Sequence, residues 1–487
     1  MSVHTQSEAQ KIRASLKHPV VDADGHWLEF PPVMIEQLRK IGGDIAVNGF
    51  FSFNKGVAKA LASTPEQRRA MRRAQEAFWP VPTRNTLDRA TELMPRLLYE
   101  RLDEFGIDFT VLYPTSGLGV PFHPDEQTRR VTCSAFNTFV ADYFGEFADR
   151  MTPAAVIPMN TPEEAISELE HVVKKLGLKV VMMASIVRRR NPAEPSTAGA
   201  PARWFDVLGL DSEYDYDPVW AKCVELGVAP TFHSGSRGIG LRMSPTNFVY
   251  NHIGHFAAAS EAVCKAIFMG GVTRRFPTLK MGFLEGGVGW ACGLYNDLIG
   301  HWKKRNREAL EEVNPANLDT AKLAKLVGQY GGKWVEQWRD NLEAIVKPDL
   351  TADIGGIREL DDYARCKIER AEDIRDLFAN NFYFGCEADD PFNAYAFNRK
   401  ANPYGAKMNI LFGSDIGHFD VQDMKDVVPE AFELVEDELI TSEDFRDFMF
   451  TNPVRFFGEG NPNFFNGTKV EKEARALLSS MRASGND

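Results

Sequence analysis

The segment PVVDADGH, residues 19–26, starts as a short apolar run and ends in acidic and histidine side chains. Seven further apolar runs follow it, each bounded by turn-forming residues. The eight runs cover residues 19–24, 109–113, 154–158, 178–183, 228–232, 279–284, 382–384 and 408–412. Most are continuous and do not alternate with polar residues, which is typical of strands buried on both faces of a parallel sheet.

Helical stretches separate these runs. One of them opens with Thr161, a suitable N-cap, and with Pro162 at the first helical position, and we expect it to stop near Gly177. Strands that alternate with helices indicate a parallel α/β architecture. Eight such strands favour a closed (β/α)8 barrel, a TIM barrel, over an open sheet.

Two long segments do not fit a bare barrel. Residues 30 to about 100 separate the first two predicted strands, and residues 300 to about 380 separate the sixth and seventh. We interpret both as helical insertions into one decorated barrel domain that spans residues 1–487. They either cap or flank the active site, or they form an interface between subunits.

Composition limits the setting of the protein. The chain has 487 residues, of which 44% are hydrophobic, so it can bury a large core. Its net charge of −12 argues against nucleic acid or an anionic membrane as the main partner. The six cysteines form no C-x-x-C pair, the N-terminus is polar, and no apolar run reaches the ~20 residues of a membrane span. We therefore predict a cytoplasmic protein.

Acidic and histidine side chains gather where the predicted strands end. Those at or just beyond the strand ends are Asp24, His26, Glu29, His233, Glu285, Asp415 and His418. Each has an ordinary structural explanation on its own: Asp415 as a helix N-cap, Glu285 as a turn acid, and a lone histidine as a hydrogen-bonded packing residue. The carboxyl ends of barrel strands, however, meet at one face. Buried charges that converge there need a common partner, and imidazole with carboxylate suits a divalent metal.

Four segments carry a resemblance to a known family. They are residues 21–29, 231–233, 268–290 and 413–418, with the sequences VDADGHWLE, TFH, FMGGVTRRFPTLKMGFLEGGVGW and GSDIGH. In this order and spacing they resemble the amidohydrolase-related family that includes aminocarboxymuconate-semialdehyde decarboxylase and the aromatic-acid decarboxylases. The resemblance covers nearly the whole chain and is more specific for the family than for one reaction.

The resemblance implies roles for four residues. His26 and His233 would bind the metal, and Asp415 would bind it or carry a proton to and from metal-bound water. His418 would contact the substrate or support Asp415. The family also implies a small-molecule substrate and a homodimer.

Two positions depart from the family pattern. Asp24 stands where many relatives have a second histidine, and Glu285 stands where the decarboxylases have one. Glu285 would then be a general base or another ligand. The fourth predicted strand ends without the lysine that often bridges two metals in the superfamily, so a bridge would have to come from Asp24, Glu29 or Glu285.

Other residues are candidate substrate contacts. His252 and His255 precede the helix that leads to the sixth strand, and we interpret them as a hydrogen-bonded loop pair or as groups that face the active site. In the second case His255 would contact the substrate or bind a second metal. Tyr113 and Trp290 are further expected contacts. Aromatic residues in the first insertion, including Phe50, Phe78 and Trp79, favour a partly apolar ligand or form the insertion's own core.

Three functions remain open at this stage. The leading one is hydrolysis or non-oxidative decarboxylation of a small organic substrate at one Zn²⁺ or Mn²⁺. The second is a non-haem diiron monooxygenase on the same fold, hydroxylating a terpenoid-type or other apolar substrate, because carboxylate-rich sites also suit two irons. The third is a binding protein that has lost catalysis. Metal identity and count distinguish the first two.

Overall fold

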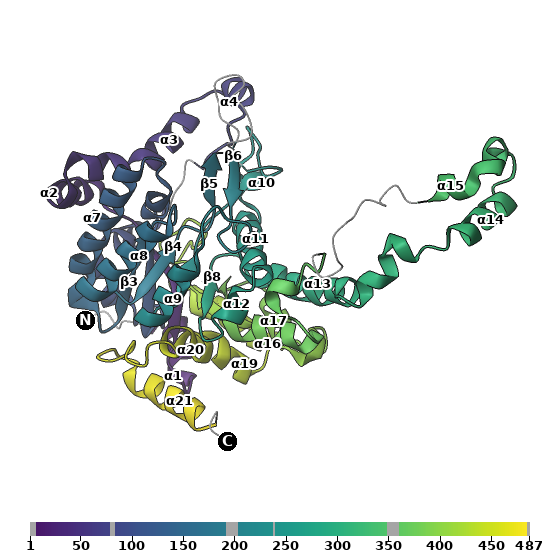
Figure 1. Ribbon diagram of the computed structural model, residues 1–487. Coiled ribbons are helices and arrows are strands. Elements are labelled where there is room, and N and C mark those ends of the chain that lie inside the picture. Colours follow the sequence, from purple (N-terminus) through teal and green to yellow (C-terminus); the bar gives the residue numbers. More distant parts are fainter. Residues whose placement is uncertain (1–5, 78–82, 191–202, 237–238, 348–359, 485–487) are drawn as a thin grey trace.

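Eight parallel strands form the centre of the molecule (Figure 1). The computed structural model describes residues 6–77, 83–190, 203–236, 239–347 and 360–484. The barrel strands are β1 (Val21–Trp27), β2 (Phe109–Pro114), β3 (Met151–Ile157), β4 (Val180–Met183), β7 (Pro230–Phe232), β8 (Met281–Phe283), β9 (Phe382–Glu387) and β10 (Asn409–Gly413), paired in that order. Each matches one of the eight predicted runs, so the (β/α)8 prediction is confirmed.

The first and last strands meet and nearly close the sheet. The backbone N–H of His26 donates to the carbonyl of Ile416 at 2.8 Å, and the N–H of Asp415 donates to the carbonyl of Asp24 at 3.0 Å. These bonds also bring two of the predicted site segments together. Almost every strand residue is buried, as expected for strands with side chains inside the barrel on one face and under helices on the other.

Helices surround the sheet (Figure 1). Those that follow the strands include α7 (Glu126–Phe144), α8 (Pro162–Glu170), α9 (Asp217–Leu226), α11 (His255–Met269), α13 (Gly289–Arg305), α16 (Ala371–Asn381), α18 (Val427–Glu436) and α20 (Asn452–Gly458). Thr161 caps α8 as predicted, since its side chain accepts from the N–H of Glu164. Shorter or peripheral helices are α1 (Glu8–Ser15), α10 (Phe248–His252), α12 (Val272–Arg275), α17 (Asn393–Phe397), α19 (Ser442–Arg446) and α21 (Glu471–Ser484).

The described residues between β1 and β2 form five helices: α2 (Pro31–Phe50), α3 (Ser52–Leu61), α4 (Pro65–Met71), α5 (Thr86–Leu93) and α6 (Pro95–Arg101). Helix α2 packs on α7, and the Phe50 ring stacks on Phe136 with centroids 5.9 Å apart. Phe50 is therefore core of this segment and not a ligand contact. Phe78 and Trp79 lie outside the described residues. The buried Arg68 of α4 donates to the carbonyl of Pro245, which ties this segment to the loop before α10.

Two features have no counterpart in the predicted strand pattern. An antiparallel hairpin, β5 (Val187–Arg190) with β6 (Arg203–Asp206), stands between β4 and β7. Between β8 and β9, the chain beyond α13 continues through α14 (Thr320–Tyr330) and α15 (Leu342–Val346) as an arm that projects far from the barrel (Figure 1). Among the described helices, none is both long and apolar enough to cross a membrane.

Candidate metal centre

Five of the predicted site residues converge at the carboxyl end of the barrel. Asp24 and His26 lie on β1, His233 directly follows β7, and Glu285 and Asp415 each come two residues after a strand. All five side chains are buried, with at most 9% of any of them exposed. The structure therefore brings together five side chains that the sequence placed at separate strand ends.

Two histidines face each other at the centre of this cluster. The Nε2 atoms of His26 and His233 are 3.1 Å apart, and Asp24 Oδ1 lies 3.6 Å from each. Ligand atoms of the three residues all lie within 4.8 Å of one another. Two imidazole nitrogens that lie this close together, next to a carboxylate, form an arrangement that can bind a metal ion.

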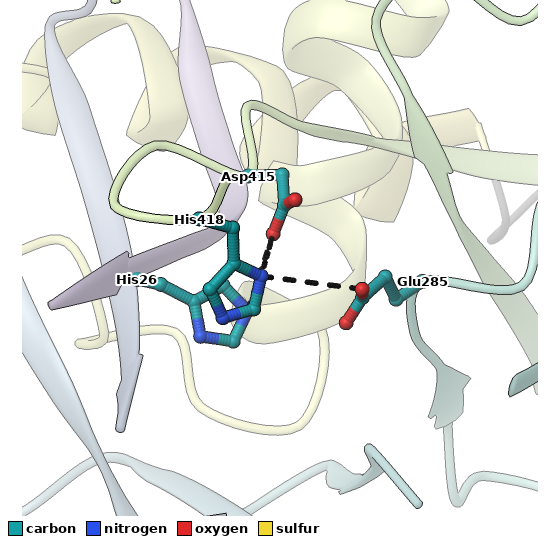
Figure 2. A group of neighbouring side chains, drawn as sticks. All are labelled: His26, Glu285, Asp415 and His418. Carbon is teal, nitrogen blue, oxygen red and sulfur yellow. Dashed lines mark ion pairs between the residues drawn. The ribbon is translucent and has the colours of Figure 1, made fainter. Parts of the chain in front are cut away.

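A second group shares His26 with the first and adds Glu285, Asp415 and His418 (Figure 2). His418 Nδ1 lies 2.6 Å from Asp415 Oδ1 and 4.0 Å from Glu285 Oε1. The His418 ring stacks on His26 with centroids 3.7 Å apart. Glu285 Oε2 in turn lies 3.1 Å from Nε2 of His233, so the two groups form one continuous cluster.

The donor set fits a divalent metal. Asp24 Oδ1 and Asp415 Oδ2 are buried and have no hydrogen-bond donor. A buried carboxylate oxygen without a partner is costly. A cation placed among the histidine nitrogens and these oxygens would satisfy both of them, and this mixture of nitrogen and oxygen suits Zn²⁺ or Mn²⁺.

Electrostatics in the cluster follow from burial and from crowded charges. Burial, together with the charges of His418 and His233, lowers the pKa of His26 well below its usual value, which favours the neutral imidazole. Burial also lowers the pKa of His233, but Asp24 and Glu285 outweigh it and raise that pKa well above its usual value. Burial, and then the charge of Asp415, raises the pKa of Glu285 to about 7. Asp24 and Glu285 thus favour positive charge at His233. A metal ion bound beside these carboxylates would be stabilised for the same reason.

Two of the site acids have a strained backbone. Glu285 has φ of +53° and Asp415 has φ of +48°, in the left-handed region that favours glycine. Such a conformation costs on the order of 1 kcal/mol and persists where the surrounding structure enforces it, often at functional sites. Here it turns each chain sharply after its strand and directs the carboxylate into the cluster.

Asp22 is a positioning residue that the sequence analysis missed. Its carboxylate accepts from the hydroxyls of Thr110 and Ser414, at 2.7 Å each, and from the N–H of Ser414 at 2.9 Å. It therefore links β1, β2 and the loop that carries Asp415. Gly25 leaves room for this carboxylate, since a Cβ there would lie 2.7 Å from Asp22 Oδ2. A buried acid within an apolar strand was the signal that could have identified it.

Glu29 lies outside both groups. Its carboxylate accepts from the N–H groups of Ser116 and Gly117, at 2.8 and 2.7 Å, and so holds the turn after β2. Burial raises its pKa to about 7. The geometry gives Glu29 a structural role in place of the ligand role that we predicted for it.

We expect Glu29→Gln to leave the metal content unchanged and to alter the pH dependence of stability. The folded pKa of about 7 exceeds the ordinary 4.5, so ionisation of Glu29 removes stability as the pH rises between these values. Relative to the variant, the wild type should lose up to about 3 kcal/mol of unfolding free energy between pH 4.5 and pH 8. Denaturant titrations of both metal-free proteins measure the difference. Loss of metal from Glu29→Gln would instead assign Glu29 as a ligand.

A cavity of about 480 Å³ leads to the cluster and reaches it at Glu285 and Asp415. Its lining includes residues 252–257, where the predicted contacts His252 and His255 stand beside Phe256. The lining also includes five further acids, Glu387, Asp389, Asp390, Asp420 and Glu430. No Lys or Arg is among the described residues that line it. None of these five acids was among the predicted site residues, because the predicted run stopped at residue 384, whereas β9 continues to Glu387.

Two other expected contacts lie outside this lining. Tyr113 is buried beside His26 and His233, with ring centroids 6.1 Å from the first and 5.6 Å from the second, and its hydroxyl lies 3.1 Å from that of Thr231. Trp290, at the start of α13, packs edge-on against Phe283 and Phe384. The structure therefore places Tyr113 beside the cluster and Trp290 against Phe283 and Phe384.

A parallel barrel with histidines and carboxylates gathered at the carboxyl ends of its strands defines a metal-dependent TIM-barrel enzyme. The chain belongs to the amidohydrolase family, whose model matches residues 21–458. It is similar to the amidohydrolase of Mycobacterium avium subsp. paratuberculosis K-10, with 18% identity, a TM-score of 0.50, and coverage of 91% of this chain and 100% of that one.

Two decarboxylases are also similar to the chain. The 2-amino-3-carboxymuconate-6-semialdehyde decarboxylase of Dictyostelium discoideum is 28% identical over 209 residues, which are 43% of this chain and 50% of that protein. The match thus spans about half the length of this curated relative. A dihydroxybenzoic acid decarboxylase of Polaromonas sp. JS666, solved with manganese and the inhibitor 2-nitroresorcinol, is 15% identical with a TM-score of 0.49, covering 92% and 99% of the two chains.

Proposed function

We propose that this enzyme removes the carboxyl group of a small, ring-containing organic acid without oxidation, at one bound divalent metal. The observation that carries the proposal is the convergence of His26 Nε2, His233 Nε2 and the Asp24 carboxylate, beside Glu285 and Asp415, which line a cavity. The activity of the Dictyostelium relative supports decarboxylation, and the manganese in the Polaromonas protein supports Mn²⁺ beside Zn²⁺ as the metal.

The charge distribution of the cavity orients such a substrate. The described lining of the cavity contains several carboxylates and no Lys or Arg that could pair with a substrate carboxylate. The acid group can therefore be stabilised only at the cluster, where the metal, when bound, supplies the positive charge that polarises substrate oxygens. The ring then lies toward Phe256 and His252, whose aromatic rings stand edge to face with centroids 6.5 Å apart and can each contact a substrate ring.

The reaction needs a proton at the same place. When the bond between the ring carbon and the carboxyl carbon breaks, CO₂ leaves and its bonding electron pair stays on the ring carbon. That carbon must then take up one proton. Two acid groups stand at the end of the cavity: Glu285, and the pair formed by His418 and Asp415, which are 2.6 Å apart and can share a proton. Either can supply it without a redox cofactor.

Hydrolysis is the second candidate. Its support is Glu285, a carboxylate next to His233 at a position where the resembled decarboxylases have a histidine. A carboxylate there can accept a proton from an attacking water. The diiron oxygenase and the binding-protein alternatives gain no support from the relatives named above, which are decarboxylases or amidohydrolases.

Two measurements test the proposal. Elemental mass spectrometry of the untreated protein should find about one zinc or manganese per chain. The metal-loaded protein is then incubated with hydroxybenzoic acids and other ring acids, and with amides and lactones of matched size. Release of CO₂ from an acid, abolished by a chelator and restored by Mn²⁺ or Zn²⁺, is the expected result. Cleavage of amides or lactones alone would favour hydrolysis, and two irons per chain would contradict both.

A further inference from the structure

The arm, residues 306–347, packs very little against the barrel of its own chain. Helix α14 packs on α15, and the arm's other segments pack mainly on one another and on α13 (Figure 1). Leu342 is the only buried residue between residues 301 and 347. Short helices without tertiary packing are marginal in water, so an arm of this kind gains its stability by packing against something else.

The arm tip, residues 320–335, has the composition of a binding surface. Tyr330 and Trp334 each expose 76% of their surface, and Leu326 exposes 41%. The same stretch contains three lysines and no acidic residue, within a chain whose net charge is −12. Exposed Trp and Tyr are the residues that most often anchor protein interfaces, and a basic tip requires an acidic partner surface.

The rim of the cavity offers the complementary surface. Leu241, Val249, Tyr250 and Ile253 form a rim patch in which every side chain is more than half exposed. The patch is one unit, because the Tyr250 hydroxyl donates to the carbonyl of Leu241. Ile253 also lines the cavity, and the same lining includes the five carboxylates described above. An apolar patch beside an acidic wall matches the apolar, basic arm tip.

We propose that the arm tip of one chain covers the rim patch of a second copy of this chain and so closes the mouth of its active site. The arm projects away from its own barrel, and a two-fold dimer, the commonest oligomer, would allow both arms to dock reciprocally. The partner would thereby bring lysines to a cavity that has no cation of its own in the described lining. That the covered cavity is an active site rests on the proposed function, whereas the docking of the arm tip on the rim patch does not.

The test is the mass of the metal-loaded full chain, measured by sedimentation over a range of concentrations. We expect twice the chain mass of 54.6 kDa. Tyr330→Ser combined with Trp334→Ser should weaken the dimer by at least about 100-fold. Tyr250→Ser combined with Ile253→Ser should weaken the dimer comparably. Lys333→Glu should also weaken the dimer, and its effect should be larger at low salt than at high salt. Leu439→Ser, which removes an exposed apolar side chain elsewhere, is the matched control and should leave the dimer intact.

Each result decides the proposal. A wild type that stays monomeric at tens of micromolar, or arm variants that remain dimeric, would overturn it. Arm variants that dissociate while the rim variants do not would overturn the rim patch as the docking surface. The substituted side chains are exposed, so circular dichroism should show folded variants. Because mass is measured without substrate, failure of the decarboxylation assay leaves this result untouched.

Discussion

Replacing His233 with alanine should remove the metal and lower turnover by at least about 10³-fold. Its Nε2 lies 3.1 Å from that of His26 and 3.6 Å from Asp24 Oδ1, so the substitution deletes one of the two nitrogen donors of the candidate centre. His26→Ala should have the same effect. The measurements are metal content per chain and the rate of the reaction found in the substrate screen.

The control for these substitutions is His301→Ala. His301 is an exposed histidine of α13 and belongs to neither group of candidate ligands. It should keep its metal and its rate. Full metal occupancy in both His26→Ala and His233→Ala would show that the ion binds elsewhere, whatever the rates.

Glu285→Gln should keep the metal and lower the rate by about 10²- to 10⁴-fold, the range for loss of a general acid or base. Glutamine preserves the size of the side chain and the contact with His233 but can neither bind nor release the proton. The ratio of rate to metal content is the quantity to compare between variant and wild type. Loss of metal from this variant would identify Glu285 as a ligand instead.

Glu285→Gly separates the strain at this position from its chemistry. Glycine adopts a φ of +53° without steric cost, and the substitution also removes a buried carboxylate. The metal-free variant should therefore unfold at a higher temperature than the metal-free wild type, while its activity is lost. A lower melting temperature would show that the side-chain contacts of Glu285 outweigh the strain.

The barrel could be predicted because parallel strands that are covered on both faces have a simple and recognisable sequence pattern. Each must be a short continuous apolar run, and all eight runs became strands. The strand-end acids and histidines could be predicted for a related reason: in a barrel, residues far apart in sequence are brought to one face by the topology alone. Three acids of the cavity lining follow the same rule, since Glu387 ends β9 and Asp389 and Asp390 come directly after it, whereas Glu430 lies on helix α18.

Other features depend on atoms that sequence spacing does not fix. Glu29 is close in sequence to the predicted ligands, but its carboxylate accepts hydrogen bonds from the backbone N–H groups of Ser116 and Gly117, in the turn after β2. Tyr113 and Trp290 point into packing and not into the cavity. The left-handed turns at Glu285 and Asp415 use residues that ordinarily avoid that conformation, so local preference could not indicate them.

The sequence by itself thus determined the barrel and the kinds of side chain at its mouth, because burial patterns and strand periodicity are local properties of the chain. Only the tertiary structure decided which of those side chains share one centre, which one holds a loop instead, and that residues 306–347 leave the barrel altogether. These outcomes depend on distances across the fold, where a single backbone N–H or a strained turn determines the direction of a carboxylate.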